Sequence, residues 1–199
     1  MVKQERAGRT RRAVLLAAAD TFADAGFESA SLIDISRRAG VSKGALYFHF
    51  VSKQALADGV RAAAAREIGS AALHARRCGG PAFQSLIDFS HELARLVRED
   101  VVVRAGVQLG QGGRGGAADA WCSLRSVFGR LLERAHAAGE LHPEVDLRRA
   151  AELLTTLAAG LVLLAPDDAD RLRPEAVHSL WTAALPALVP AERCAAYRI

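Results

Sequence analysis

The chain has 199 residues, of which 51% are hydrophobic, and this length is enough to bury one or two compact cores. Alanine, leucine and arginine are abundant while β-branched and aromatic residues are few, so we expect an all-α protein. The formal net charge is +4, and residues 1–53 hold nine bases and five acids, so the whole excess lies in this first part of the chain.

Residues 31–50 predict two short helices joined by a tight turn. Ser31 is a suitable N-cap for the first helix, and Gly40 supplies the left-handed residue that ends it. Ser42 caps the second helix, and Leu46 can point back into a core. The residues that then face outwards are Lys43, Gly44, Tyr47 and His49. A second helix this short can lie in a DNA major groove, so the pattern predicts a helix-turn-helix.

The position of the positive charge supports that interpretation. DNA-binding proteins place Lys and Arg where they neutralise phosphates. A basic cluster can also be an ordinary solvated face. Its coincidence with the helix-turn-helix favours contact with DNA.

The sequence from Gly40 to Phe50, Gly-Val-Ser-Lys-Gly-Ala-Leu-Tyr-Phe-His-Phe, resembles the recognition helix of TetR-type transcriptional regulators. Residues 13–27 resemble the first helix of that family, and residues 53–57 resemble the start of its fourth helix. The resemblance covers about the first quarter of the chain. It implies a three-helix DNA-binding domain at 1–53 and a ligand-binding and dimerisation domain at 54–199. The residues that it implies for DNA binding are Ser31, Ser42, Lys43, Gly44, Tyr47, Phe48, His49 and Lys53.

Side-chain chemistry assigns roles to some of these residues. Tyr47 and His49 can donate to phosphate oxygens, and Lys53 adds charge at the start of the next helix. Lys43 is the candidate for a base edge, because Lys pairs with guanine in the major groove. Gly44 would allow a close backbone approach.

The rest of the chain also predicts helices. Helical spacing of apolar residues is expected over 52–77, 81–99, 118–138, 146–164 and 174–188, and residues 101–109 form a short apolar segment. Residues 110–116 are too rich in glycine to be anything but a loop or a flexible helix end, and residues 166–170 are expected to form a loop. About nine helices result, as in TetR-type proteins. Gly139 and Asp146 are the expected helix end and helix cap.

Two late apolar helices are candidates for a dimer interface. TetR-type proteins use their last two long helices in this way, and a dimer reads two half-sites about 34 Å apart. The same residues can instead be the ordinary core of a monomer. They are Leu153, Leu157, Leu161, Leu164, Val177, Leu180, Trp181 and Leu188.

A second, shorter match concerns the ligand. Residues 103–109, Val-Arg-Ala-Gly-Val-Gln-Leu, and Trp121 resemble the γ-butyrolactone-type receptors of actinomycetes, a branch of the same family. The resemblance implies a small lactone-like effector, although the glycine-rich loop departs from the usual proline-containing stretch. The residues expected to bind it are Trp121, Gln108, Thr155, Leu86 and Val107. Thr155 and Thr156 can alternatively bond carbonyl groups of their own helix.

Other classes of protein fit less well. Gly110, Gly112 and Gly115 match the dinucleotide pattern G-x-G-x-x-G, but only Val101-Val-Val resembles a preceding strand. The six histidines lack metal-ligand spacing, so no metal is expected. The sequence also has no G-x-S-x-G elbow, and neither a cofactor nor enzymatic activity is expected. A helix-turn-helix protein that responds to no ligand stays open, as does a regulator that answers an antibiotic.

Three cysteines, Cys78, Cys122 and Cys194, are far apart and odd in number, which favours a reducing cytoplasm over a disulfide framework. The N-terminal residues lack the apolar stretch of a signal peptide. The longest apolar run, 157–165, is too short to cross a bilayer, which takes about 20 residues. We therefore expect a cytoplasmic repressor with DNA, a small effector and a second copy of itself as partners.

Overall fold

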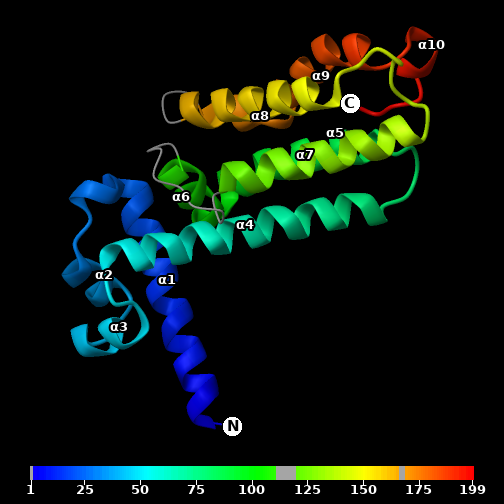
Figure 1. The fold of residues 1–199 in the computed structure, drawn as a ribbon. Helices are drawn as coiled ribbons and strands as arrows, with labels where there is room; N and C mark the ends of the chain where they lie inside the picture. Colours follow the sequence, from blue (N-terminus) through cyan, green and yellow to red (C-terminus); the bar gives the residue numbers. More distant parts are fainter. Residues whose placement is uncertain (1, 111–119, 166–168) are drawn as a thin grey trace. The chain divides into compact units, whose positions relative to one another are not determined.

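A computed structural model describes residues 2–110, 120–165 and 169–199, and every regular element in these ranges is a helix (Figure 1). The predicted all-α class is therefore confirmed. The helices are α1 (Val2–Ser29), α2 (Leu32–Arg38), α3 (Lys43–His49), α4 (Lys53–Arg77), α5 (Gln84–Glu99), α6 (Val101–Gly110), α7 (Ala120–Ala137), α8 (Leu147–Leu164), the 3₁₀ helix η1 (Ala169–Leu172), α9 (Pro174–Leu188) and α10 (Ala191–Cys194).

Most helix ends lie where the sequence places them. The Ser31 hydroxyl accepts a hydrogen bond from the Ile33 amide at 3.2 Å, and Asp146 caps α8 by accepting from the amides of Arg148 and Arg149. Gly40 and Gly139 have φ angles of 65° and 67°, the left-handed conformation that ends a helix at little cost when no Cβ is present.

The short apolar segment after residue 100 forms helix α6, which Asp100 caps by accepting from the Val102 amide at 2.8 Å. Two local features differ from the prediction. Pro81 precedes α5 by a turn instead of lying in its first turn. The short helix α10 was not predicted, because its four residues show no helical spacing of apolar side chains. The predicted loop residues 111–116 and 166–168 lie outside the described ranges.

The chain forms two compact units. Unit 1 contains residues 1–66 and 100–120, and unit 2 contains residues 67–99 and 121–199. Helix α4 therefore contributes its first half to unit 1 and its second half to unit 2. The functional division expected after residue 53 stays a prediction, and packing divides the chain at other points.

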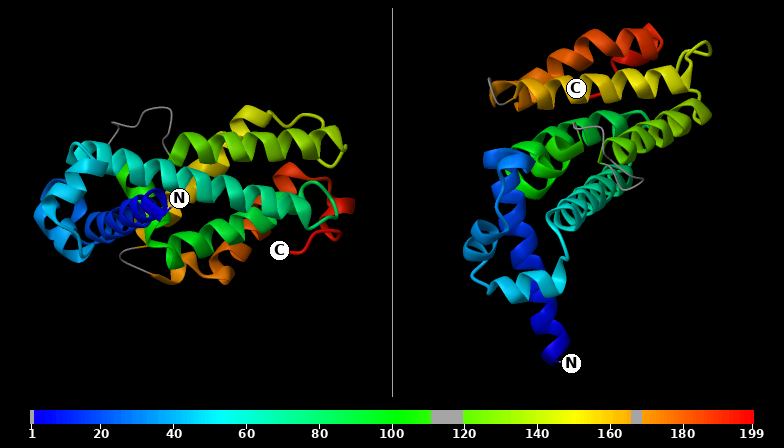
Figure 2. Two further views of the ribbon diagram at one scale, coloured as in Figure 1. Left: turned by 90° about the horizontal axis from the view of Figure 1, so that it is seen from below. Right: turned by 60° about the vertical axis from the view of Figure 1, so that its left-hand side comes forward.

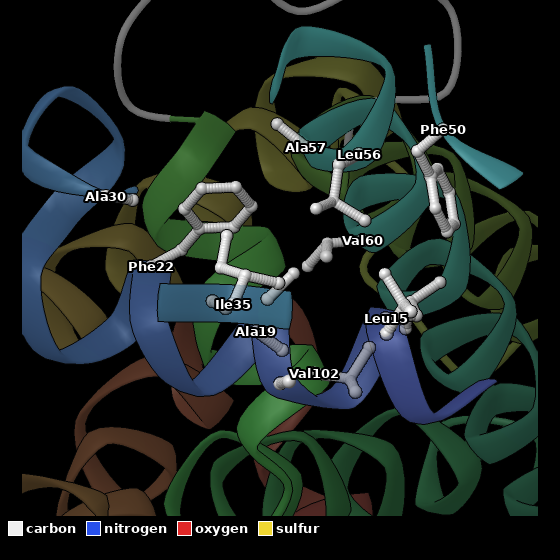
Figure 3. Close-up of a cluster of buried hydrophobic side chains, with 14 of the residues drawn as sticks. Leu15, Ala19, Phe22, Ala30, Ile35, Phe50, Leu56, Ala57, Val60 and Val102 are labelled. Carbon is white, nitrogen blue, oxygen red and sulfur yellow. The ribbon is translucent and has the colours of Figure 1, made fainter. Parts of the chain in front are cut away.

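Unit 1 has a core built from α1 to α4 and α6 (Figure 3). Phe22, Ile35 and Leu56 converge there, with 3% of Phe22 and none of the other two exposed. Val102 from α6 packs into the same cluster, although it lies far from the other residues in the sequence. The first three helices are thus closed by a segment, α6, whose first residue, Val101, comes 52 positions after His49, the last residue of α3.

The contact between α4 and α6 in unit 1 is unusually close. A Cβ added to Gly106 would overlap the side chain of Ala64. Nearby, the buried guanidinium of Arg61 donates 3.0 Å to the Leu109 carbonyl and pairs with Asp58 at 2.7 Å. Arg61 thereby satisfies a carbonyl in the last turn of α6, which has no partner within its own helix.

Unit 2 holds a second core. Helices α8 and α9 both contribute to it (Figure 2). The rings of Phe89 and Phe128 meet edge to face there, with centroids 5.5 Å apart. The buried carboxylate of Glu140 accepts from the amides of Ala82 and Phe83 at 2.8 and 2.7 Å and from the Tyr197 hydroxyl at 3.2 Å. These bonds fasten the start of α5 and the end of the chain to the turn after α7.

Candidate DNA-binding surface and apolar cavity

One side of α3 packs into the core of unit 1, and the other side is exposed to solvent. Ser42 caps it by accepting from the Ala45 amide at 3.2 Å, and Leu46 is completely buried. Because consecutive helical residues are 100° apart, a single buried anchor leaves a wide face for solvent. The residues expected to face outwards, Lys43, Gly44 and Tyr47, are exposed, and His49 is half-buried.

That open face combines a cation with aromatic rings. The Lys43 Nζ lies 5.9 Å from the centroid of the Tyr47 ring. Phe48 is 81% exposed and meets the His49 ring edge to face at 5.2 Å. A large exposed aromatic side chain on a helix that needs only one core anchor indicates a contact surface.

Ser31 and Lys53 already form hydrogen bonds within the protein, Ser31 as the N-cap of α2. The Lys53 Nζ donates to the carbonyls of Glu28 and Ala30 at 2.9 and 3.2 Å and lies 4.7 Å from the centroid of the Phe27 ring. It therefore satisfies carbonyls at the end of α1. An ammonium has three N–H donors, so one remains for a further acceptor. The hydrogen bonds of Lys53 were not foreseen from the sequence, because they join residues about 25 positions apart.

Unit 2 contains a small cavity of about 50 Å³ between α5, α8 and α9. Its described lining is almost wholly apolar: Ser90, Leu93, Ala94, Val97, Phe128, Leu154, Leu157, Ala158, Leu161, Val162, Leu172, Val177, Leu180, Trp181 and Ala184. The Trp181 Nε1–H donates to the Ser90 hydroxyl at 2.6 Å, and that hydroxyl donates to the Ile87 carbonyl at 2.7 Å. The polar atoms of this pair are thus bonded to protein.

The five predicted ligand residues lie outside the described lining of this cavity. Leu86 and Val107 are buried in packing, and Gln108, Trp121 and Thr155 are half-buried. The Thr155 hydroxyl donates to the Ala151 carbonyl at 2.7 Å. Thr156 bonds the Glu152 carbonyl in the same way at 2.9 Å, so both threonines adopt the backbone-bonded alternative.

The candidate dimer residues lie in different surroundings, and the side chain of Leu164 lies outside the described part of the structure. Five of them, Leu157, Leu161, Val177, Leu180 and Trp181, line the cavity. Leu188 is buried, and Leu153 is 51% exposed. Leu163, which the apolar pattern did not single out, is 61% exposed. Sequence periodicity marks the apolar face of α8 but does not distinguish a face turned inward from one turned to solvent.

The structure before the G-x-G-x-x-G motif does not fit a dinucleotide-binding site. Val101, Val102 and Val103 begin helix α6, whereas the G-x-G-x-x-G motif requires a strand before its first glycine. Gly110 is the last residue of that helix, and Gly112 and Gly115 lie outside the described residues. The described ranges contain no cluster of three or more His, Cys, Asp or Glu that would hold a metal ion. In the same ranges, no helix is both long enough and apolar enough to cross a membrane.

The fold and the capped, outward-facing α3 define a helix-turn-helix DNA-binding protein. Residues 14–60 match the family described as bacterial regulatory proteins, tetR family. The A-factor receptor protein of Streptomyces griseus is 34% identical over 191 residues, which cover 94% of this chain and 67% of that protein. The chain therefore belongs to the tetR family of bacterial regulatory proteins.

Solved structures place it beside gamma-butyrolactone receptors of that family. A crystal structure of a gamma-butyrolactone receptor, an ArpA-like protein, matches with a TM-score of 0.82 and 29% identity, covering 94% of this chain and 92% of the receptor. The TetR family protein CprB from Streptomyces coelicolor, in complex with its biological operator sequence, matches with a TM-score of 0.79 and 29% identity over 96% of this chain and 93% of CprB. This chain is a DNA-binding transcriptional repressor that resembles these receptors.

Proposed function

We propose that this repressor binds a pseudo-palindromic operator as a homodimer and releases it when a small lactone-like effector binds unit 2. The observation that carries the proposal is the open face of α3, on which Lys43, Gly44, Tyr47 and Phe48 are exposed together. Helix α3 has only seven residues, so it presents about two turns to a groove.

The roles of these residues and of Lys53 at the start of α4 follow from the groups that each side chain can donate. Lys43 reads a guanine edge, while Tyr47, His49 and Lys53 hold phosphates. A Cβ on Gly44 would meet only the Ser42 hydroxyl oxygen, at 4.0 Å, so a base edge or sugar can approach the backbone there. Ser31 and Ser42 present their hydroxyls at the starts of α2 and α3, where backbone amides already point outwards.

The dimer is supported by the apolar side chains that α8 exposes. Leu153 and Leu163 are more than half exposed on that helix, and covering them with a second copy would remove this apolar area from water. A two-fold dimer also repeats α3, which allows two half-sites about 34 Å apart to be read at once.

The effector class is supported by the named functions of the relatives and by the apolar interior of unit 2. Trp121 offers a flat apolar wall and one N–H donor, and it is the second residue of α7. Within unit 2, Thr155 is the polar candidate and Leu86 an apolar one, whereas Gln108 and Val107, which the resemblance also implies, belong to unit 1. The Thr155 hydroxyl is already used as a donor, so it would serve a ligand as an acceptor.

Helix α4 is the proposed route of coupling, because it contributes residues to both units without a break. Coupling of this kind is typically about 1–3 kcal/mol, or 5–150-fold in operator affinity. Linkage is reciprocal, so operator DNA must weaken effector binding by the same factor.

A selection from random duplex DNA, followed by fluorescence anisotropy, tests the proposal. The wild type should enrich a palindrome, bind it as a dimer, and release it when a synthetic γ-butyrolactone with an alkanoyl chain is added. Trp121→Ala should bind the same operator and fail to release it. Failure to enrich any sequence contradicts the operator assignment, and release by the Trp121→Ala protein contradicts the pocket assignment.

A repressor that answers no effector is the second candidate. The small cavity volume, about 50 Å³, favours it, because drug-sized ligand sites occupy about 300–1,000 Å³. This candidate predicts that lactones leave the operator affinity and the melting temperature unchanged.

A further inference from the structure

The excess positive charge of this chain lies ahead of the matched family domain. Residues 1–13 carry five bases and one acid, a net charge of +4, from Lys3, Arg6, Arg9, Arg11 and Arg12 against Glu5. The part of the helix-turn-helix from residue 14 to residue 53 carries four of each and is neutral: Arg37, Arg38, Lys43 and Lys53 against Asp20, Asp24, Glu28 and Asp34. Because residues 54–199 hold 17 bases and 17 acids, the first 13 residues account for the whole +4 of the chain.

These residues continue helix α1 beyond the matched domain. The family match begins at residue 14, whereas α1 begins at Val2. Figures 1 and 2 show the first turns of α1 projecting past α3 within unit 1. Residues 5–12 span about 12 Å at the helical rise.

Three arginines form one ridge on this projecting segment. Arg6, Arg9 and Arg12 follow each other at three-residue spacing and therefore lie on one side of the helix. All three are exposed, and none forms a salt bridge with a carboxylate in the described part of the chain. A ridge of exposed guanidinium groups without carboxylate partners suits an anionic ligand that is itself extended.

Arg11 fixes this segment against the recognition helix. Its guanidinium carbon lies 5.0 Å from the centroid of the Phe50 ring, and Phe50 is the C-cap of α3. One turn further on, Val14 and Leu15 are buried in the core of unit 1. The arginine ridge thus starts beside the end of α3, held by a helix whose next turn is packed.

We infer that residues 5–12 of α1 form a second DNA contact, in which Arg6, Arg9 and Arg12 bind backbone phosphates flanking the half-site that α3 reads. This inference rests on the proposed operator binding and adds a segment outside the matched family domain. Phosphate contacts position a protein without specifying sequence. The segment therefore raises affinity for all duplex DNA, and α3 supplies the base preference.

The test compares two triple variants of the full chain by anisotropy across a series of KCl concentrations. Arg6→Gln/Arg9→Gln/Arg12→Gln removes the ridge, and Gln keeps a helix propensity close to that of Arg. Arg76→Gln/Arg77→Gln/Arg130→Gln removes the same charge from exposed positions of α4 and α7. The duplexes are the operator selected by the wild type and a scrambled sequence of equal length.

The ridge variant should weaken binding to both duplexes by the same factor, and the salt slope should fall by about 0.9 for each phosphate that the protein no longer neutralises. The control triple should keep the wild-type salt slope unchanged. Equal slopes for wild type and ridge variant overturn the inference, as does an equal fall in the control triple. A changed base preference at flanking positions also overturns it, because phosphates carry no such information.

Lys43→Ala separates this inference from the proposed function. If Lys43→Ala abolishes operator preference while the ridge variant keeps the wild-type slope, the operator proposal stands and the second contact is wrong. If the wild type selects no operator while the ridge variant still lowers the slope on random duplex, the second contact stands and the operator proposal fails.

Discussion

Gly106 of α6 faces Ala64 of α4 with no room for a methyl group between them, because a Cβ on Gly106 would overlap the Ala64 side chain. The Val60 carbonyl oxygen would lie 3.5 Å from the same Cβ. Glycine is needed here for close approach and not for a left-handed backbone. Any side chain at position 106 must push the two helices apart.

Gly106→Ala should therefore destabilise the protein by about 1–3 kcal/mol, the usual cost of overpacking a filled core. Gly69→Ala in α4 is the matched control, since its Cβ would meet nothing within 4 Å. That control should gain about 0.5–1 kcal/mol from the better helix propensity of alanine. Urea unfolding measures both, and equal signs for the two substitutions would contradict the close contact.

Lys53→Met should affect both folding and DNA binding. It removes the bonds to the Glu28 and Ala30 carbonyls, so we expect a decrease of about 1–2 kcal/mol in unfolding free energy. If the remaining N–H holds a phosphate, the salt slope falls by about 0.9 as well. Lys43→Met, which removes the same charge from an exposed side chain, should leave the melting temperature unchanged. A Lys53→Met protein as stable as wild type would show that these bonds contribute nothing.

The hydrogen bond between Trp181 and Ser90 should respond asymmetrically to substitution. Ser90→Ala leaves the indole N–H without its acceptor among apolar side chains, at a cost of about 1–3 kcal/mol. The double variant Ser90→Ala/Trp181→Phe removes both polar partners, so its cost should be less than the sum of the two single costs. Strict additivity in urea unfolding would contradict a stabilising bond.

Acid should weaken the packing of α5 through His91. Burial lowers the pKa of His91 below its ordinary 6.5, and His178 adds to this effect while Asp88 opposes it. The unfolded chain then takes up the proton at a higher pH than the folded one. Stability from neutral His91 is full above about pH 6.5 and is lost as the pH falls from there toward the lowered pKa. Melting temperatures at pH 7.5 and 5.5 should differ more for wild type than for His91→Gln, and a larger difference for the variant would contradict this sign.

Helix ends could be predicted from the sequence because short-range chemistry determines them. Ser31, Ser42 and Asp146 cap helices through their own side chains, and Gly139 ends one by its own conformation. Helix α10 could not be predicted in this way, because its four residues after Pro190 are too few to show a helical spacing of apolar residues. Residue pattern also marked the apolar faces of α8 and α9, but not whether a cavity or a partner covers them.

The candidate DNA surface could be predicted for a related reason. A seven-residue helix with one apolar anchor, Leu46, must expose its other side chains. The hydrogen bonds of Lys53 and the stacking of Arg11 on Phe50 could not be predicted, since each joins positions brought together only by the fold. The ligand residues rest on resemblance, and Trp121, Gln108 and Thr155 stay predictions.

The core shared by α6 and the short N-terminal helices limits how such regulators can be recombined. Val102, Ala105 and Leu109 help to fill the core around Phe22 and Ile35. A chimaera that grafts only residues 1–66 onto another effector domain would leave this part of its core unfilled or clashing. The transferable DNA-reading module is discontinuous in the gene, and an engineer or a recombination event must carry both segments together.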